Sequence, residues 1–381
     1  MKHFSVLFSI AFIFSLFLTD CKNGKTGGEK EPNNTIGEAN KAVPQESFPI
    51  SINPKADVDW FKMELPGQGY LKVQAGETPG NLELEVSFAR YQEWEGEKEK
   101  RIRGWNRLPD AVFIPEKGTW YFAVKDNYDD AYSKETVDIR ASFLKEFDNH
   151  EPNDTPEDAA VVEPGEIINP AVYPKKDQDW FQVHVKEQGY LSVQSNHVPE
   201  GIKPEVLFAV YDPWAEPKKQ EIRSWHGLPD ACFVPDSGNY LIKLHDDYDD
   251  GCAESTFDLK VNFIKEMDQG EPNDHFEDAK MVSRGDTLDV AIFPQEDMDY
   301  FKLENTRAGE LKIAAKGFSG VVPEARLFIM DENNPEELEE VSNWKGLPAT
   351  FETKVDETYF LLVHDDYDDQ GSSTPFQLLI E

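Results

Sequence analysis

Hydrophobic and polar residues alternate with a period of two along most of this chain. In the segment DWFKMEL, Phe61, Met63 and Leu65 fall on one side of an extended strand and the residues between them on the other. The segment DWFQVHV at 179–185 repeats the pattern. Further short alternating segments, such as EVLFAVYD, NYLIKLHD and STFDLKVNF, are separated by Gly, Pro, Asn and Asp residues typical of turns. No segment has a long apolar pattern with helical period, so the sequence predicts an all-β protein.

The same succession of segments occurs three times. EPNN begins at position 31 and EPND at positions 151 and 271, which are intervals of 120 residues. DVDWF, DQDWF and DMDYF keep this interval, as do GYL, GYL and GEL. Roughly eight short strands in each repeat favour an antiparallel β-sandwich of jelly-roll type.

The repeats define the expected domain organisation. We predict a signal peptide over 1–20, a tether over 21–30, and three tandem antiparallel β-sandwiches over 31–147, 151–267 and 271–381. The segments that join the sandwiches are short and are not rich in Gly and Ser, so freely flexible linkers are not expected.

The order of these motifs resembles the bacterial pre-peptidase C-terminal (PPC) domain. The resemblance rests on EPND, DxDWF, G-Y-L, a strand ending in YD, and a terminal strand after G-x-Y, and it covers about 31–381. It implies secreted, non-catalytic β-sandwiches that bind or tether. Members of the family are appended to peptidases, and this sequence has no attached peptidase.

The resemblance also implies calcium ligands. Collagen-binding relatives hold Ca2+ with an acidic segment leading into E-P-N-[ND] and with an Asp pair before the aromatic strand, and Ca2+ prefers such oxygen ligands. The corresponding positions here are Glu29, Glu31, Asn33, Asn34, Asp57 and Asp59; Glu151, Asn153, Asp154, Asp177 and Asp179; and Glu271, Asn273, Asp274, Asp297 and Asp299. Helix capping by Thr155 and ordinary Asp turns are the alternative explanation.

Two further expectations concern these sites. Asn149 and Gln269 stand where the first repeat has Glu29, which predicts one negative charge fewer in the later sites. Acidic residues of the two linkers lie just before the E-P-N motifs and are expected to share an ion with them; they are Glu146, Asp148, Glu266 and Asp268.

The charge of the chain narrows the choice of partners. Its 381 residues carry a formal net charge of −36 and a sequence pI of about 4.5. Such a surface repels nucleic acids and anionic lipid head groups and attracts cations. Acidity that only maintains solubility is the alternative.

The N-terminal segment predicts export. FSVLFSIAFIFSLFL is apolar but too short for a typical spanning helix, and Cys21 follows it directly in LFLTDC. The arrangement resembles a bacterial lipoprotein signal of the looser spirochaete type, with Asp20 in place of the usual small residue. We expect Cys21 to be lipidated and the protein to be held at the cell envelope, on the outer membrane or cell surface. A plain secretory signal with a free Cys21 is the alternative.

The two remaining cysteines are Cys232 and Cys252. In an exported chain, an even pair is more often bonded than free. We therefore expect a local disulfide in the second sandwich.

Each repeat also has an Asp-rich segment, KDNYDD at 125–130 and HDDYDD at 245–250 and 364–369. It does not fit an EF-hand, because Cys252 stands where that loop needs Gly. A solvated loop, a cation site and a protein-binding surface remain open. The tyrosines Tyr128, Tyr248 and Tyr367 are expected to pack across the loop base.

Aromatic residues suggest a second possible function. Trp60, Trp180 and Tyr300 alternate away from the core, and exposed rings bind sugars by stacking. Packing that covers the second face of the sheet is the alternative. No His recurs in all three repeats and no catalytic motif is present, so we expect a non-catalytic protein. Its partners would be the membrane, through the lipid, and an unknown protein or glycan. A hydrolase site within one repeat is the remaining alternative.

Overall fold

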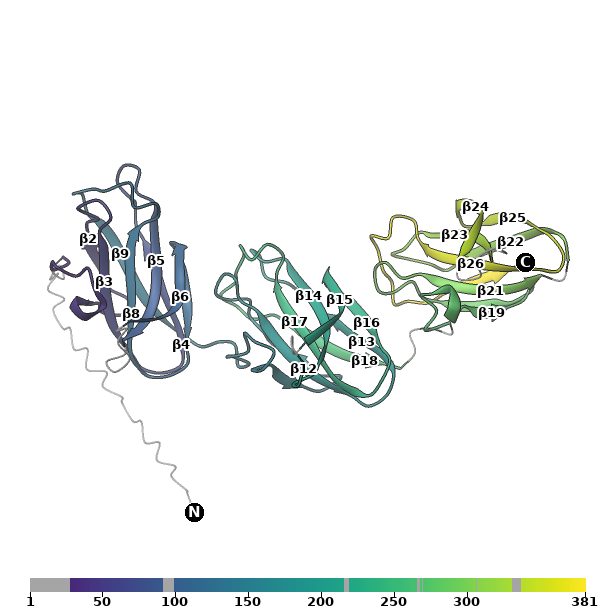
Figure 1. The fold of residues 1–381 in the computed structure, drawn as a ribbon, viewed down its shortest axis with the longest axis horizontal. Helices are drawn as coiled ribbons and strands as arrows, with labels where there is room; N and C mark the ends of the chain where they lie inside the picture. Colours follow the sequence, from purple (N-terminus) through teal and green to yellow (C-terminus); the bar gives the residue numbers. More distant parts are fainter. Residues whose placement is uncertain are drawn as a thin grey trace, which may run out of the picture. The chain divides into compact units, whose positions relative to one another are not determined.

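The structure is a computed structural model that describes residues 28–91, 99–215, 219–265, 268, 270–305, 307–330 and 337–381. The predicted signal peptide and Cys21 lie outside the described residues. The described residues form three β-sandwiches in chain order (Figure 1). The prediction of an all-β fold with three tandem sandwiches is confirmed.

Nine strands make up each sandwich. The first contains β1 (Asn40–Lys41), β2 (Ser47–Ile50), β3 (Val58–Leu65), β4 (Gly69–Ala75), β5 (Leu84–Tyr91), β6 (Glu99–Arg107), β7 (Asp110–Ile114), β8 (Gly118–Asp126) and β9 (Val137–Lys145). The second contains β10 (Ala160–Val162), β11 (Ile167–Ile168), β12 (Asp179–Val185), β13 (Gly189–Gln194), β14 (Pro204–Tyr211), β15 (Lys219–Gly227), β16 (Asp230–Val234), β17 (Gly238–Asp246) and β18 (Leu259–Ile264). The third contains β19 (Lys280–Val282), β20 (Thr287–Val290), β21 (Asp299–Asn305), β22 (Gly309–Lys316), β23 (Pro323–Met330), β24 (Leu338–Gly346), β25 (Ala349–Thr353), β26 (Glu357–Asp365) and β27 (Phe376–Ile380). Two 3-10 turns, η1 (Ile36–Glu38) and η2 (Phe276–Asp278), are the only helical segments among the described residues.

Each sandwich has one five-stranded and one four-stranded sheet. In the first, the strand orders are β1-β3-β8-β5-β6 and β2-β9-β4-β7, and the other two sandwiches repeat them. Pairing is antiparallel except at one edge, where the short strands β1, β10 and β19 run parallel to β3, β12 and β21. The sheets are antiparallel as predicted except at that edge, where the chain crosses to the second sheet before it returns to form the long strand.

The alternation seen in the sequence places the cores between the sheets. Phe61, Met63 and Leu65 of β3 are almost fully buried, and Phe181 and Val183 of β12 are completely buried. Separate apolar clusters form the cores of the second and third sandwiches, so each builds its own core.

Contacts divide the chain into two compact units. One is the described part of Met1–Leu65 with Lys72–Pro109 and Gly118–Phe143, and the other is Pro66–Leu71, Asp110–Lys117 and Leu144–Glu381. The second and third sandwiches thus belong to one unit. No helix in the described part of the chain is long and apolar enough to cross a membrane.

Candidate metal centre

In every sandwich, a backbone hydrogen bond attaches the E-P-N segment to the strand that carries the aromatic residue. The amide of Trp60 donates to the carbonyl of Asn33 at 2.9 Å. The corresponding pairs are Trp180 with Asn153 at 2.8 Å and Tyr300 with Asn273 at 2.9 Å. These bonds join residues that are 27 positions apart in sequence, and they bring the two motifs to one place in each sandwich.

A fully buried aspartate lies at the centre of each site. Asp59, Asp179 and Asp299 have no exposed surface, and neither carboxylate oxygen of any of them has a hydrogen-bond partner. Burial, followed by the negative charges of Glu29 and Asp57, raises the pKa of Asp59 to about 9. Burial and neighbouring acids also raise the pKa of the other two well above the usual range. Because an ionised carboxylate is costly to bury without a partner, these side chains need either a proton or a cation.

Further acids surround this aspartate. Carboxylate oxygens of Glu29, Glu31 and Asp59 lie within 4.8 Å of one another, and so do those of Asp268, Glu271 and Asp299. In the second sandwich, Asp148 and Glu151 are the charges that most strongly raise the pKa of Asp179 after burial itself. Burial raises the pKa of Glu151 to about 8 and that of Glu271 to about 7.

The sequence alignment does not identify the residue that corresponds to Glu29 in the second and third repeats. Glu29 accepts a hydrogen bond from the amide of Ser51 at 2.6 Å. The amides of Ala171 and Ala291, which occupy the position of Ser51, donate instead to Asp148 and Asp268, also at 2.6 Å.

The predicted loss of one charge in the later sites is therefore wrong. An Asp one position earlier in the chain replaces the Glu, while Asn149 is exposed and Gln269 lies outside the described residues. The linker residues Asp148 and Asp268 do join the E-P-N acids, as expected. Glu146 is only half-buried, and Glu266 is not among the described residues.

The first aspartate in each Asp pair before the aromatic strand has different hydrogen bonding from the second, fully buried one. Asp57 accepts hydrogen bonds from the amides of Asn53 at 2.9 Å and Val58 at 3.1 Å. Asp177 and Asp297 make the same bond to the residue four positions earlier, both at 2.8 Å. The sequence predicts both members of the pair as ligands. In the structure, the first accepts hydrogen bonds that close a turn, and the second has no hydrogen-bond partner.

The asparagines also differ among themselves. Asn33, Asn153 and Asn273 are buried, and the side-chain oxygens of Asn33 and Asn273 lack a hydrogen-bond partner. The residues that follow them, Asn34 and Asp154, are exposed and lie outside the buried groups, and Asp274 is only partly buried.

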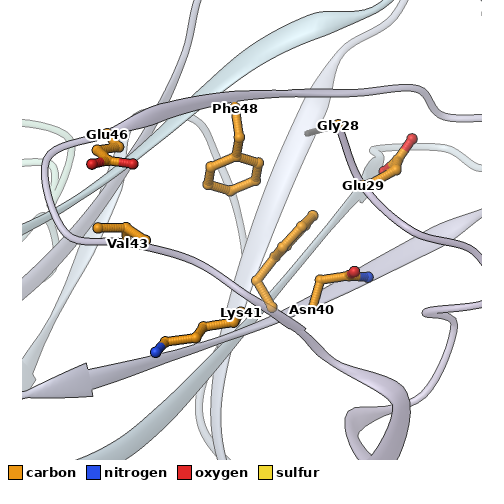
Figure 2. Close-up of a pocket in the computed structure, with 8 residues that line it drawn as sticks. Gly28, Glu29, Asn40, Lys41, Val43, Glu46 and Phe48 are labelled. Carbon is orange, nitrogen blue, oxygen red and sulfur yellow. The ribbon is translucent and has the colours of Figure 1, made fainter. Parts of the chain in front are cut away.

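The donor set fits a hard divalent cation. Each site offers carboxylate and amide oxygens, several of them buried and unpartnered, and Ca2+ takes oxygen ligands of these kinds. In the first sandwich, a small pocket of about 70 Å³ opens beside Glu29 (Figure 2). Phe48 and Phe61 line it, with Lys41 and Glu46 on the side away from Glu29.

The aromatic residues do not form sugar-stacking platforms. Trp60 and Trp180 are only 4% and 3% exposed, and Tyr300 is half-buried. Trp60 packs with Ile36 and Trp105 in a second apolar cluster outside the main core. Of the two interpretations of these rings, sugar stacking is wrong and packing over the second face of the sheet is confirmed for Trp60 and Trp180. Ile36 of η1 packs with Trp60, and residues of the neighbouring strands pack with Trp180.

The first Asp of each Asp-rich loop folds the loop. Asp246 accepts hydrogen bonds from the amides of Lys203 at 2.8 Å and Gly251 at 2.7 Å, and Asp126 and Asp365 accept equivalent bonds. Tyr128, Tyr248 and Tyr367 are 68%, 76% and 79% exposed. The expectation that these rings pack across the loop base is wrong, because the buried Asp carboxylate already closes the loop from below.

The residue that precedes the first Asp of each Asp-rich loop lies between an aromatic ring and a carboxylate. The His245 ring is 3.9 Å from that of Trp225, and its Nδ1 is 3.0 Å from Asp249. Lys125 occupies this position in the first sandwich, 5.0 Å from the Trp105 ring and 3.1 Å from Asp129. The feature shared by the two sandwiches is therefore a basic side chain held by a ring and an acid.

Cys232 and Cys252 are not bonded to each other in this structure, so the predicted disulfide is not present. Cys232 faces the core of the second sandwich from the middle of β16, where burial raises the pKa of its thiol. Cys252 packs instead against a different cluster that contains Tyr70 and Tyr173. The two side chains thus belong to different apolar clusters.

Comparisons with known proteins give no family assignment. No family model matches the chain, and no curated protein matches it. The solved structures with weak similarity include two that each have a TM-score of 0.17. The CUB1-EGF-CUB2 domain of human MASP-1/3 is 10% identical, covering 57% of this chain and 98% of that one. The M60 catalytic domain with the CBM51-1 and CBM51-2 domains from Clostridium perfringens ZmpB is 9% identical, covering 89% of this chain and 38% of that one. Similarity at this level carries no argument about function.

Proposed function

We propose that this protein is a non-catalytic array of three calcium-stabilised β-sandwiches that works as a binding or structural module at the cell envelope. The observation that carries the proposal is the threefold repetition of a buried aspartate, Asp59, Asp179 or Asp299, with two unpartnered carboxylate oxygens. A turn or a cap does not require such a residue, since Asp57 closes the turn by itself.

Calcium would stabilise the native state by binding where the unfolded chain offers no preformed site. Glu29, Glu31, Asn33 and Asp59 would hold the ion in the first sandwich, and the corresponding residues would do so in the others. An ion present at a hundredfold excess over its dissociation constant contributes about 2.7 kcal/mol to the free energy of unfolding. The resemblance to PPC domains, of which collagen-binding members hold Ca2+ at the corresponding motif positions, agrees with this proposal.

Attachment to the envelope would depend on Cys21. Mass spectrometry of the mature protein should find an acylated Cys21 as the first residue. An unmodified N-terminus at another position would refute the lipid anchor without affecting the calcium sites.

The calcium proposal is tested by thermal melting of the mature chain in Ca2+ and in EDTA. We expect a higher melting temperature in Ca2+, and a smaller calcium effect in the variant Asp179→Asn. The matched control is Asp177→Asn, which changes the neighbouring hydrogen-bonded carboxylate and should keep the calcium effect. Equal melting temperatures of the unmutated protein in Ca2+ and EDTA would refute the proposal.

A further inference from the structure

The second sandwich contributes a tyrosine to the edge of the third sandwich's cation site. Tyr190 of β13 is 3% exposed, and its ring packs with Phe233 of β16 and with Ala291 and Phe293, which follow β20. Its hydroxyl is buried and makes no hydrogen bond in this structure. A buried hydroxyl without a partner is costly, and its position therefore needs an explanation.

Glu271 offers the acceptor that this hydroxyl lacks. One carboxylate oxygen of Glu271 accepts a hydrogen bond from the amide of Asn273 at 3.2 Å, and the other is buried without a partner. Tyr190 lines one pocket together with Asp274 and Asp297, which lie within three residues of Glu271 and two residues of Asp299 in the chain. Burial raises the pKa of the Glu271 carboxyl, and the tyrosine hydroxyl opposes the rise. An unused donor and an unused acceptor thus lie at the same edge of the site.

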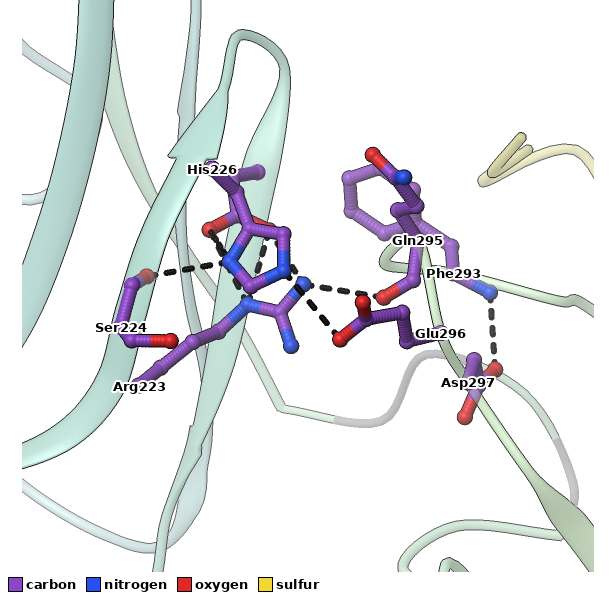
Figure 3. Close-up of polar contacts among 8 residues, drawn as sticks. Arg223, Ser224, His226, Phe293, Gln295, Glu296 and Asp297 are labelled. Carbon is purple, nitrogen blue, oxygen red and sulfur yellow. Dashed lines mark hydrogen bonds and ion pairs between the residues drawn. The ribbon is translucent and has the colours of Figure 1, made fainter. Parts of the chain in front are cut away.

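The second sandwich also contacts the loop between β20 and β21 through residues of β15. Arg223 of β15 donates to the carbonyl of Gln295 at 2.9 Å, and Nε2 of His226 lies 3.2 Å from a carboxylate oxygen of Glu296 (Figure 3). The same loop provides the Ala291 amide that binds Asp268, and it leads into Asp299. A change in the cation site therefore reaches the residues that the second sandwich contacts.

We propose that Tyr190 is a positioning residue for the cation site of the third sandwich, and that its hydroxyl orients the Glu271 carboxylate for ion binding. Binding of the ion and contact of the 291–297 loop with the second sandwich then form one coupled equilibrium. Coupling of this kind is reciprocal, so the ion strengthens the contact as much as the contact strengthens ion binding. This inference rests on the proposed calcium sites.

The repeats provide an internal comparison. Tyr70, at the equivalent position of β4, is buried with an unpartnered hydroxyl, and its ring centroid is 5.0 Å from that of Tyr173. The charge of Glu151, which has an unpartnered oxygen of its own, affects the Tyr70 hydroxyl. In the third sandwich this position is the exposed Glu310. Glu310 is therefore a control position that contacts no cation site in the described residues.

The test measures calcium binding site by site in the full mature chain. Hydrogen-exchange mass spectrometry during a Ca2+ titration gives a separate midpoint for peptides covering residues 51–59, 171–179 and 291–299. In Tyr190→Phe, which keeps the ring, we expect the 291–299 midpoint to rise about tenfold, the lower end of the effect of removing a group that orients a metal ligand. The other two midpoints should not change, and Glu310→Gln should change none.

A second readout follows the contact itself. Ca2+ should increase protection in peptides covering residues 188–192 of the second sandwich, and less so in Tyr190→Phe. An unchanged 291–299 midpoint in Tyr190→Phe, or no effect of Ca2+ on residues 188–192, would overturn the inference while leaving the calcium sites standing. Absence of any calcium-dependent protection in all three site peptides would instead refute the proposed function.

Discussion

Replacing Asp59 with Asn should stabilise the protein in the absence of calcium and remove one site's share of stabilisation in its presence. The carboxylate of Asp59 is fully buried without a hydrogen-bond partner, and its pKa in the folded state is about 9. At pH 7 without an ion, the folded protein therefore keeps a proton on Asp59 that the unfolded chain, with an ordinary pKa of about 3.9, releases.

The size of this effect follows from proton linkage. A difference of about three units between pH 7 and the unfolded pKa, at about 1.4 kcal/mol per unit, costs the folded state up to about 4 kcal/mol. Asn carries no titrating proton, and it leaves a similarly unpaired polar group in the site, so Asp59→Asn removes most of this cost. In Ca2+ at a hundredfold excess, the unmutated protein gains about 2.7 kcal/mol from the site, and the variant gains nothing there.

Urea unfolding of both proteins in EDTA and in Ca2+ measures the two effects. Asp57→Asn is the control, because Asp57 already accepts two backbone hydrogen bonds and should lose about 1–3 kcal/mol under both conditions. If Asp59→Asn is destabilising in EDTA and still shows the full calcium increment, Asp59 is a structural residue and the reasoning fails.

Three other predictions follow from the same structure. In EDTA, stability should fall as the pH rises from about 4 towards 9, because the raised pKa of Asp59 makes the folded state the stronger proton binder over that range; a urea series that shows stability rising over this range contradicts the assignment. Native protein should leave the buried thiol of Cys232 unmodified by thiol reagents, and non-reducing peptide mapping should recover it unlinked to Cys252, whereas a joined peptide would show that the disulfide forms. Asp246→Ala should cost about 2–4 kcal/mol, because it removes a buried carboxylate that accepts hydrogen bonds from the amides of Lys203 and Gly251, while Tyr248→Ser should change stability by less than about 0.5 kcal/mol. Equal effects of the two substitutions in denaturant unfolding would refute this description of the loop.

The architecture was predictable because its signals are periodic. Alternation over Phe61, Met63 and Leu65 predicted the buried face of β3, and the interval of 120 residues predicted three sandwiches. The short parallel strand β1 was not predictable, since two residues carry no period.

The site was only partly predictable because the position of a residue along the chain does not determine where its side chain points. Asp57 and Asp59 have the same residue type two positions apart, and only the turn to Asn53 shows which carboxylate is already hydrogen-bonded. Asp148 was placed in the linker but not aligned with Glu29, since a shorter side chain one residue earlier reaches the equivalent amide.

The sequence also does not show which side chains are buried on the faces of the sheets that point away from the core. Period-two alternation gives the side of the sheet on which Trp60 lies, but not whether η1 covers that side. In the same way, the sequence DDYDD does not show that one Asp folds inward while Tyr248 remains in solvent.

Isothermal titration calorimetry of Ca2+ into the EDTA-treated and dialysed mature chain would show whether the three sandwiches bind the ion. We expect saturable binding with one ion for each sandwich, and loss of one ion's share of the heat in Asp299→Asn. Titration heats that do not differ from those of dilution would contradict the claim that the three buried aspartates are cation ligands.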